Sequence, residues 1–381
     1  MKCLILAAGY ATRLYPLTEN FPKPLLKVGE KSILDWLVDD LVDTTDIDEF
    51  VVISNHKPVR YIFALNKRIG FLDNGIALPF VLNNRIAPQE KENYIKYFNE
   101  ENFDVVIGAG IEYSLLLGEI KKDISAKTIG WQHSTYGSYF ERRGATGYGL
   151  TKYVKKCYSA LDGIWVLTNS DKKEFDNNLA IESKVLYNPL PKNDSISTTY
   201  EEGYVLFAGR LEREHKGLDY LIEVIKKISE EVPKLRVTII GDGPSHNWLK
   251  VEIEKAGLGE KVNLLGTTDN VYQFYSRASV MVQTSRWEGF GMTILEAMSC
   301  GIPVVAFHNY GPDEIIRDSV DGYLVDHFDT EVFAKKVAEI LKQPEQREQM
   351  GKCAIERSRD FSLEKVLPLF KQYLEEAAKG L

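Results

Sequence analysis

Short apolar runs alternate with amphipathic helical patterns along almost the whole of this 381-residue chain. In the first half, strands are expected at residues 3–7, 50–54, 103–107, 126–131 and 163–168, and helices at 33–41, 89–99 and 113–122. In the second half, strands are expected at 204–208, 235–240, 262–265, 280–283 and 303–306, with helices at 217–229 and 245–256. This rhythm is typical of parallel sheets covered by helices. The sequence therefore predicts an α/β protein with two doubly wound, Rossmann-like domains that face a cleft.

A polar stretch marks the expected boundary between the two domains. Asn188 and Pro189 are followed by NDSISTTYEEG at residues 193–203, whose small polar residues are typical of an interdomain linker. We expect an N-terminal domain over residues 1–190 and a C-terminal domain over 200–360. Residues 361–381 are expected to hold an amphipathic helix that can pack back on the N-terminal domain.

The charge balance argues against a nucleic-acid partner. The chain carries 55 acidic and 47 basic side chains, a formal net charge of -8, whereas phosphate backbones need a concentrated positive surface. No segment approaches the roughly 20 uninterrupted apolar residues of a membrane span, and the opening lacks the apolar core of a signal peptide. We expect a cytoplasmic protein. Lys152, Lys155 and Lys156 leave open a peripheral contact with the inner face of the membrane, although a solvated helix face is the simpler interpretation.

The four cysteines are widely spaced, at Cys3, Cys157, Cys300 and Cys353. They form no CxxC pair, so the sequence predicts reduced thiols rather than a disulfide framework or a zinc site.

The run EGFGMTILE at residues 288–296 places two carboxylates eight positions apart around a glycine-rich turn. Glu288 precedes an expected helix, and Glu296 lies one turn inside it. This arrangement can hold a sugar with one carboxylate and a ribose with the other, while the amides of the helix start face a diphosphate. Taken alone, the run is better explained as a strand–turn–helix corner with solvated glutamates.

Cations follow the first strand of the C-terminal domain. Gly209 and Arg210 come directly after it, and Lys216 lies near the start of the next helix. In an open α/β sheet ligands bind at this edge, where Arg210 and Lys216 can bind a diphosphate and neutralise it as a leaving group. Such cations are often only solvated. Gly241, in IIGDGP, forms either a tight turn or a wall of the same pocket.

Four stretches, FAGRLEREHKGLD, IIGDGP, SRWEGFGMTILEAMSCGIPVVA and GPDEIIRDSVDGYLV, follow one another between residues 207 and 325. In this order and spacing they resemble the retaining GT-B glycosyltransferases of family four. The resemblance implies transfer of a hexose from a nucleotide diphosphate sugar, of which a UDP-sugar is favoured, with retention of configuration and with no metal or other cofactor. The acceptor it implies is a saccharide or a lipid-linked saccharide, as in bacterial surface polysaccharides.

By this resemblance, Arg210 and Lys216 bind the donor diphosphate, Glu296 holds the donor ribose and Glu288 contacts the donor sugar. Backbone groups complete the donor site at Gly209, Gly241, Phe290, Gly291, Met292 and Thr293.

In the N-terminal half, GWQHSTYGSYF places His133 at the end of an expected strand, where it should face the cleft. It resembles the family's strand-end histidine near the donor sugar and the acceptor, and a structural role is equally plausible for a lone histidine. Nearby aromatic residues either line an acceptor groove or belong to the core: Trp131, Tyr136, Tyr139, Phe140 and Tyr148.

The opening of the chain departs from that family. LILAAGYATRLYPLTENFPKPLLKVGEKSILDWLVDDL, at residues 4–41, resembles the sugar-phosphate nucleotidyltransferases. In that family Gly9 would cradle a nucleotide, Arg13 would contact the triphosphate and Lys23 would hold phosphates. The resemblance fades after residue 57, and the later candidate for a magnesium ligand, Asp104, stands at the start of its strand instead of at its end.

We therefore interpret residues 1–57 as a borrowed β-α-β piece that takes the place of the glycosyltransferase's own first β-α-β unit. The chain is then an apparent chimera, natural or engineered. Gly9, Arg13 and Lys23 are either anion-binding remnants or solvated. Two alternatives to glycosyl transfer remain: a chimera that binds nucleotide sugar but is catalytically impaired, and nucleotidyl transfer with magnesium, for which the metal aspartate is missing.

Overall fold

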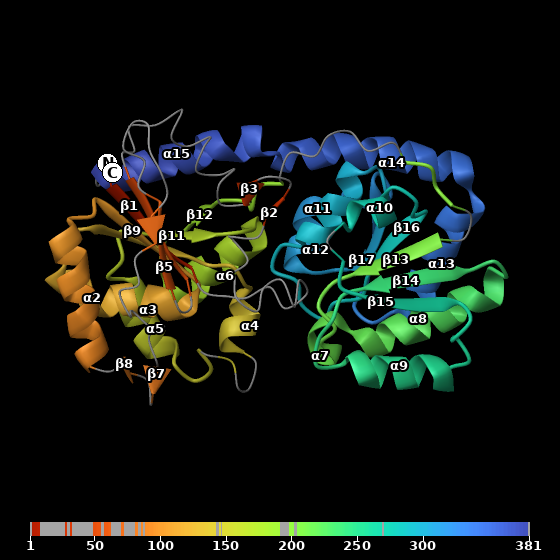
Figure 1. Ribbon diagram of the computed structural model, residues 1–381, viewed down its shortest axis with the longest axis horizontal. Helices are drawn as coiled ribbons and strands as arrows, with labels where there is room; N and C mark the ends of the chain where they lie inside the picture. Colours follow the sequence, from red (N-terminus) through yellow and green to blue (C-terminus); the bar gives the residue numbers. More distant parts are fainter. Residues whose placement is uncertain are drawn as a thin grey trace. The chain divides into compact units, whose positions relative to one another are not determined.

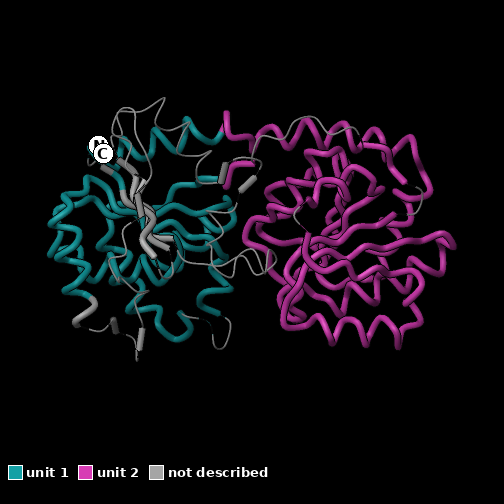
Figure 2. The backbone as a smooth tube through the Cα atoms, in the orientation of Figure 1, with its two compact units in different colours: residues 1–10, 20–187, 366–381 teal, residues 11–19, 188–365 magenta. Residues whose placement is uncertain are grey.

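The computed structural model describes residues 2–7, 27–28, 31–32, 49–54, 57–61, 70–71, 81–82, 85–86, 88–141, 145, 147–190, 198–201, 204–268 and 270–379. The chain divides into two compact units (Figure 2). The first unit holds residues 1–10, 20–187 and 366–381, and the second holds residues 11–19 and 188–365. The division between residues 187 and 188 falls at the Asn188–Pro189 step.

The first unit is built on an eight-stranded sheet in the order β12-β11-β10-β9-β1-β4-β5-β6 (Figure 1). The strands are β1 (Lys2–Ala7), β4 (Glu49–Ser54), β5 (Lys57–Tyr61), β6 (Gly70–Phe71), β9 (Val105–Ala109), β10 (Lys127–Trp131), β11 (Gly163–Val166) and β12 (Lys184–Val185). All neighbours from β12 to β4 are parallel, whereas β5 and β6 add an antiparallel edge. Two small hairpins pair β2 (Lys27–Val28) with β3 (Lys31–Ser32) and β7 (Val81–Leu82) with β8 (Arg85–Ile86).

Strand β1 lies in the middle of this sheet, between β4 and β9. Cys3 is in register with Phe50 on one side and with Val105 on the other. Strands β1 and β4 are therefore an integral part of the parallel sheet. The expected helix at 33–41 lies outside the described residues.

The described helices of the first unit, apart from the last helix of the chain, are α2 (Pro88–Glu101), α3 (Ile111–Ile120), α4 (Tyr136–Phe140), α5 (Thr151–Tyr158) and α6 (Asn169–Leu179). Two of them begin at threonine caps: Thr135 accepts from the Ser138 amide, and Thr168 accepts from the Asp171 amide. Helix α3 is buried almost throughout and touches α5 closely at Gly118, where a Cβ would lie 2.3 Å from the Cys157 carbonyl oxygen.

The second unit contains a six-stranded parallel sheet in the order β15-β14-β13-β16-β17-β18. The strands are β13 (Tyr204–Ala208), β14 (Arg236–Ile240), β15 (Val262–Gly266), β16 (Val280–Gln283), β17 (Val304–Phe307) and β18 (Gly322–Val325). The helices are α7 (Arg213–Lys216), α8 (Leu218–Glu231), α9 (His246–Lys255), α10 (Tyr272–Tyr275), α11 (Met292–Ser299), α12 (Tyr310–Ile315), α13 (Thr330–Lys342) and α14 (Pro344–Ser358). Counted within the unit, the strand order is 3-2-1-4-5-6, and it reverses between β13 and β16, which is where ligands bind in such sheets.

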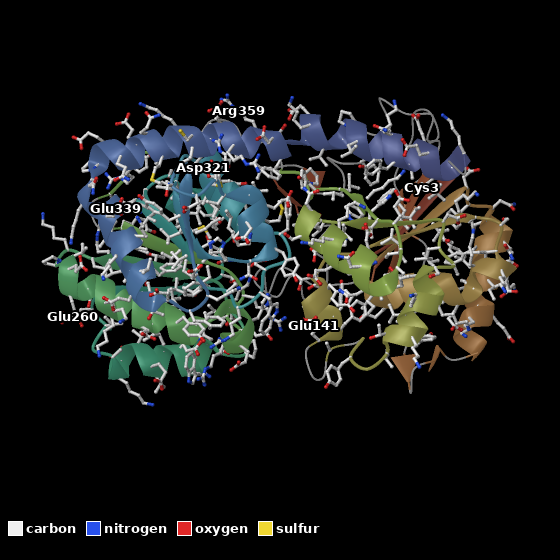
Figure 3. The ribbon with its side chains drawn as sticks, turned by 180° about the vertical axis from the view of Figure 1, so that it is seen from behind. Cys3, Glu141, Glu260, Asp321, Glu339 and Arg359 are labelled. Carbon is white, nitrogen blue, oxygen red and sulfur yellow. The ribbon has the colours of Figure 1, made fainter. Side chains whose placement is uncertain are left out.

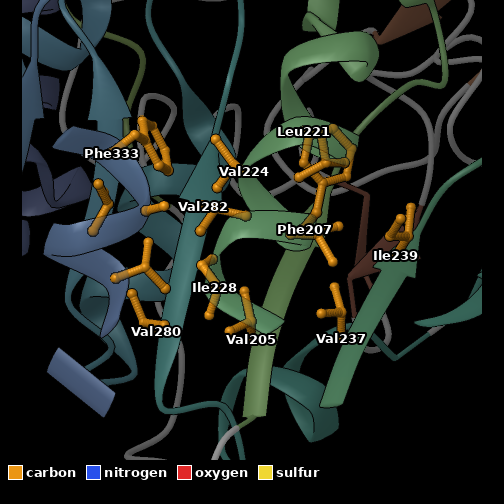
Figure 4. Close-up of a cluster of buried hydrophobic side chains, with 14 of the residues drawn as sticks. Val205, Phe207, Leu221, Val224, Ile228, Val237, Ile239, Val280, Val282 and Phe333 are labelled. Atoms are coloured by element: carbon orange, nitrogen blue, oxygen red, sulfur yellow. The ribbon is translucent and has the colours of Figure 1, made fainter. Parts of the chain in front are cut away.

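The core of the second unit packs one face of this sheet against α8 and α13 (Figure 4). Leu221, Val224 and Ile228 recur at helical spacing on α8, which gives that helix a continuous apolar face. The strand residues on this face alternate along the chain and are fully buried or nearly so: Val205, Phe207, Val237, Ile239, Val280 and Val282. Each such side chain contributes about 2 kcal/mol through removal from water.

The last helix, α15 (Leu363–Lys379), belongs to the first unit from residue 366 onward. The Phe370 ring packs against the rings of Trp131 and Trp165, at centroid distances of 5.9 and 5.6 Å. Lys184 and Glu376 add an ion pair with Nζ 2.5 Å from Oε2. An amphipathic helix with this apolar face thus covers the β10–β11 part of the first sheet.

The sequence expectations agree with these elements to within two residues at each end, for every expected strand and for the helices that lie in the described ranges. The antiparallel strands β5 and β6 were not expected. All four cysteines are free, with Cys3 (Figure 3), Cys157 and Cys300 buried. Within the described part of the chain, no helix combines the length and apolar composition that crossing a bilayer requires.

Candidate functional site

The candidate site of the second unit forms at the carboxyl ends of β13 and β16, where the strand order reverses. Gly209 and Arg210 follow β13, and Lys216 closes the short helix α7. The sequence had indicated that Lys216 stands near the start of the following helix. In the structure it is the last residue of α7. Glu288 lies on the loop that joins β16 to α11. Two neighbouring strands therefore bring these polar residues to one edge of the sheet.

Lys216 and Glu288 form an ion pair in which Nζ lies 2.5 Å from Oε2. Their side chains are only 10% and 14% exposed. Burying either charge alone would be strongly unfavourable, so each stabilises the other in the ionised state. Sequence reasoning expected both residues at the site but did not predict that they contact each other.

The side-chain amides of Gln283 and Asn309 fix the position of Glu288. Gln283 Nε2 donates to Oε2 at 2.8 Å, the same oxygen that Lys216 contacts. Asn309 Oδ1 accepts from the Glu288 backbone N–H at 3.2 Å, while Asn309 Nδ2 donates to the Ser285 carbonyl at 2.9 Å. Asn309 thereby bridges the two ends of the turn at 285–288, so both the carboxylate and the backbone of Glu288 are fixed.

A second set of contacts ties this loop to α7. The Arg286 N–H donates to the His215 carbonyl at 2.9 Å, and Thr284 Oγ1 donates to the Lys216 carbonyl at 3.0 Å. The Arg286 guanidinium also binds both oxygens of Asp219, at 3.0 and 2.6 Å. Gly217 permits the close approach, because its φ is +58° and a Cβ there would lie 2.1 Å from the Thr284 carbonyl oxygen. The elements that carry Lys216 and Glu288 are therefore held together by both backbone and side chains.

His215 stacks on Trp287 beside this pair, with ring centroids 5.2 Å apart and an interplanar angle of 9°. Burial, and after it the positive charge of Lys216, lowers the pKa of His215 to about 4. The imidazole is thus neutral at pH 7, so it adds no positive charge to the site.

Two glycines bring the ends of β13 and β14 together. Gly241 has a φ of +137°, and a Cβ there would lie 1.8 Å from the Gly209 carbonyl oxygen. The Gly209 N–H also donates to the Ile240 carbonyl at 2.9 Å. Gly241 is therefore needed for a close backbone contact, and the two loops together form one end of the candidate site.

The start of α11 supplies further backbone donors. Gly291, with a φ of +98°, precedes the helix, and Met292 and Thr293 occupy its first turn, where no side chain caps the amides. The Phe290 ring is buried against Phe361 at 5.8 Å. Glu296 lies one turn inside the helix, as expected, and accepts from the Tyr275 hydroxyl at 3.0 Å.

The remaining expected residues are not brought to the Lys216–Glu288 pair by any described contact. Arg210 is exposed and lies 3.6 Å from Glu212. His133 belongs to the first unit, where it follows β10, is exposed, and lies 4.6 Å from Trp131 between ring centroids. Gly9, Arg13 and Lys23 lie outside the described residues.

The aromatic residues around His133 are mostly core. Trp131, Tyr136 and Phe140 are buried, and Tyr136 and Phe140 pack on Phe175. Tyr148 is 50% exposed. Of the two interpretations that the sequence left open, the core role therefore applies to the first three.

Sequence reasoning did not single out Gln283 or Asn309. Gln283 is the last residue of β16, and Asn309 lies just after the end of β17. Both strands are buried and otherwise apolar, and both residues stand at the carboxyl end of their strand. A polar side chain in that position is the signal that could have identified both.

Two family models match the chain. Residues 192–357 match the family described as glycosyl transferases group 1, and residues 2–93 match the family described as nucleotidyl transferase. The C-terminal part of this chain thus carries a domain similar to the glycosyl transferases group 1. The chain is a glycosyltransferase with a nucleotidyltransferase-like N-terminal segment, and that segment extends to residue 93, beyond the residue 57 at which the sequence resemblance fades.

Relatives cover different parts of the chain. An uncharacterized glycosyltransferase of Haemophilus influenzae is 26% identical over 338 residues, which are 85% of this chain and 90% of that protein. The poly(glycerol-phosphate) alpha-glucosyltransferase of Bacillus subtilis is 24% identical over 240 residues, which are 60% of this chain and 36% of that protein. A mutant of TarM from S. aureus, solved with Fondaparinux, alpha-GlcNAc-glycerol and UDP, superposes with a TM-score of 0.66 at 20% identity, over 86% of this chain and 75% of that one. The fold is GT-B.

Proposed function

We propose that this chain transfers a hexose from a UDP-sugar to a saccharide acceptor, with retention of configuration and without a metal ion. The observation that carries the proposal is the Lys216–Glu288 pair at the point where the strand order of the second sheet reverses. TarM, which shares the fold, is solved with UDP and a GlcNAc-glycerol. The Bacillus relative is named as an alpha-glucosyltransferase.

The donor diphosphate is the group that this site can stabilise. As the bond between sugar and phosphate breaks, negative charge develops on the departing diphosphate. Lys216, Arg210 and the first amides of α11, at Met292 and Thr293, supply positive charge and oriented N–H groups to meet it. Because these groups perform the neutralisation that a metal ion supplies elsewhere, we expect transfer to proceed in the presence of a chelator.

The two glutamates of the site have separate roles in this proposal. Glu288 contacts the transferred sugar and Glu296 holds the donor ribose, while Gly209 and Gly241 let the nucleotide approach the backbone. The different contacts of the two carboxylates support this division. The Glu288 carboxylate is bound to a lysine and one side-chain amide, whereas the Glu296 carboxylate accepts from the Tyr275 hydroxyl.

On the acceptor side, we propose that His133 contacts the acceptor saccharide, which is free or lipid-linked. Lys152, Lys155 and Lys156 are all exposed on α5, so a peripheral contact with an anionic membrane surface is open to them.

The assignment of Glu296 is tested with a nucleotide that lacks the ribose hydroxyls. Glu296→Ala should weaken UDP binding about 10- to 100-fold, because it removes a charged hydrogen-bond acceptor from the two hydroxyls. Calorimetric titration with UDP and with 2′,3′-dideoxy-UDP should show that the wild type prefers UDP, and that the variant binds the two alike. Tyr275→Phe serves as the control, since it leaves the carboxylate in place and should keep the preference for UDP. An unchanged preference in Glu296→Ala would place the ribose elsewhere.

A further inference from the structure

Gln283 is a buried amide whose presence is not explained by binding of the sugar donor alone. It is the last residue of β16 and is 1% exposed. Nε2 donates to Glu288 Oε2 at 2.8 Å, whereas Oε1 is buried and has no hydrogen-bond partner within the described part of the chain. A carboxylate accepts hydrogen bonds only, so the orientation of the amide is fixed by Glu288. A buried carbonyl oxygen without a donor is unfavourable, and an apolar side chain of the same size would avoid it.

The carboxylate oxygen that Gln283 contacts is shared with a cation. Lys216 Nζ lies 2.5 Å from the same Oε2. In the proposed function Lys216 also binds the diphosphate, and an ammonium drawn toward that anion weakens its contact with Glu288. Gln283 cannot move in the same way, because it lies in a buried strand. Its uncharged amide also has no attraction for phosphate comparable to that of a lysine.

We propose that Gln283 is a positioning residue, which keeps the Glu288 carboxylate oriented and ionised when Lys216 engages the donor diphosphate. This inference rests on the proposed function. Lys216 then serves two anions in turn, while Gln283 maintains its 2.8 Å hydrogen bond to Glu288 throughout. The Ser285 hydroxyl, 3.5 Å from the same oxygen, makes a weaker contact. The position at the end of a buried strand gives the amide a fixed direction.

The segment around α7 brings further charged and titratable groups to this part of the site. Lys216 contacts Glu288 directly, and His215 is influenced by the charges of Lys216, Glu288 and Glu212. Burial holds the pKa of His215 at about 4, so its charge does not change between pH 5 and pH 8. His215 therefore does not contribute to a change in acid behaviour within that range.

The chain offers a matched control for removing the amide. Gln346 Nε2 donates to Glu339 Oε1 at 3.1 Å, and Gln346 Oε1 is likewise buried with no partner among the described residues. Lys336 binds the same carboxylate at 3.1 Å. This second lysine–glutamate–glutamine group joins α13 to α14, away from the strand ends that form the candidate site (Glu339 is labelled in Figure 3).

The experiment compares Gln283→Leu with Gln346→Leu in the full chain. Gln283→Leu should lower kcat about tenfold or more and should leave the donor KM within about threefold, because one hydrogen bond to a charged group is lost. The acidic limb of the kcat profile should move about one pH unit upward, since the ionised carboxylate has lost a donor. Gln346→Leu should match the wild type in all three quantities.

Gln283→Glu adds a variant in which the ability of residue 283 to donate a hydrogen bond to Glu288 depends on pH. A protonated carboxyl can donate to Glu288, whereas two ionised carboxylates repel each other. Its activity relative to Gln283→Leu should therefore be higher at pH 5 and lower at pH 8. If Gln283 served only in packing, the relative activity of the two variants would not reverse between pH 5 and pH 8.

Proton uptake supplies a readout that does not require turnover. UDP is titrated at pH 5.5 in two buffers of different ionisation heat. Gln283→Leu should take up more protons on binding UDP than the wild type, since Glu288 then has neither Lys216 nor the amide. Equal uptake, together with equal kcat and an unshifted acidic limb, would overturn the positioning role while leaving glycosyl transfer in place. A wild type that does not bind UDP would instead overturn the proposed function itself and, with it, this inference.

Discussion

Lys216→Met is expected to lower UDP affinity about 10- to 100-fold and the rate of hexose transfer about 100- to 1,000-fold. The methionine keeps the length and apolar contacts of the lysine stem but removes the ammonium. Because charge on the diphosphate increases as the sugar departs, the rate should fall more than the affinity. Donor titration and initial-rate measurements at pH 7.5, with a chelator present, check both numbers.

Two further variants separate this effect from loss of the fold. Lys227→Met removes a lysine whose Nζ lies 2.7 Å from Glu331 on the surface of the same unit, and it should change neither binding nor rate. Lys216→Met leaves the Glu288 charge partly buried without its cation and should lower the melting temperature. Adding Glu288→Gln should restore much of that stability but none of the activity. Full transfer activity in Lys216→Met would remove this residue from the mechanism.

Glu288→Gln is expected to separate binding from turnover. The amide no longer pairs with Lys216 and no longer repels the diphosphate, so UDP should bind as tightly as to the wild type or about threefold more tightly. Transfer should fall about 100-fold, because the group that contacts the sugar has lost its charge. Calorimetry with UDP and single-turnover kinetics with a UDP-hexose measure the two effects on the same preparation.

The control for this variant is Glu339→Gln, which removes a carboxylate that also binds a lysine and a glutamine. It should leave transfer intact. If Glu288→Gln bound UDP less tightly by tenfold or more, the carboxylate would be supporting the nucleotide and not the sugar. Lys216→Met and Glu288→Gln thus have opposite expected effects on binding, although their side chains contact each other.

Strands β13 and β16 could be predicted because they are buried on both faces and read as short apolar runs. The run at residues 204–208 and the run at 280–283 match β13 and β16. The strand ends then placed Gly209, Lys216 and Glu288 at one edge of the sheet, since parallel strands share their carboxyl edge. Local pattern and sheet topology were sufficient for this much of the candidate site.

The contacts within the site could not be read in the same way. Lys216 and Glu288 are 72 positions apart, and Asn309 is 21 positions beyond Glu288. Side chains at such separations meet only through the tertiary packing of α7, the 284–288 loop and β17. The role of Gln283 is hidden for a further reason, because a glutamine at the end of a strand has no pattern of its own until its partner is known.

In the first unit, the sequence pattern misleads about how far the nucleotidyltransferase-like segment extends along the chain. The resemblance that can be read from the sequence fades after residue 57, whereas the family model matches to residue 93. Strand β5 begins at residue 57 with an antiparallel pairing that no βαβ rhythm predicts. The aromatic cluster near His133 was equally ambiguous, since burial and ligand stacking favour the same side chains. Only the packing of Phe140 on Phe175, and of Trp131 on Phe370, resolves it.

The most direct measurement is a calorimetric titration of the full chain with UDP in the presence of EDTA, repeated with magnesium and then with nucleoside triphosphates. The site at the ends of β13 and β16 predicts that UDP binds with the same affinity with and without the metal, and that Lys216→Met weakens this binding. Binding only of a triphosphate, only with magnesium, and with equal affinity in Lys216→Met would contradict it and would place the nucleotide site in the N-terminal segment.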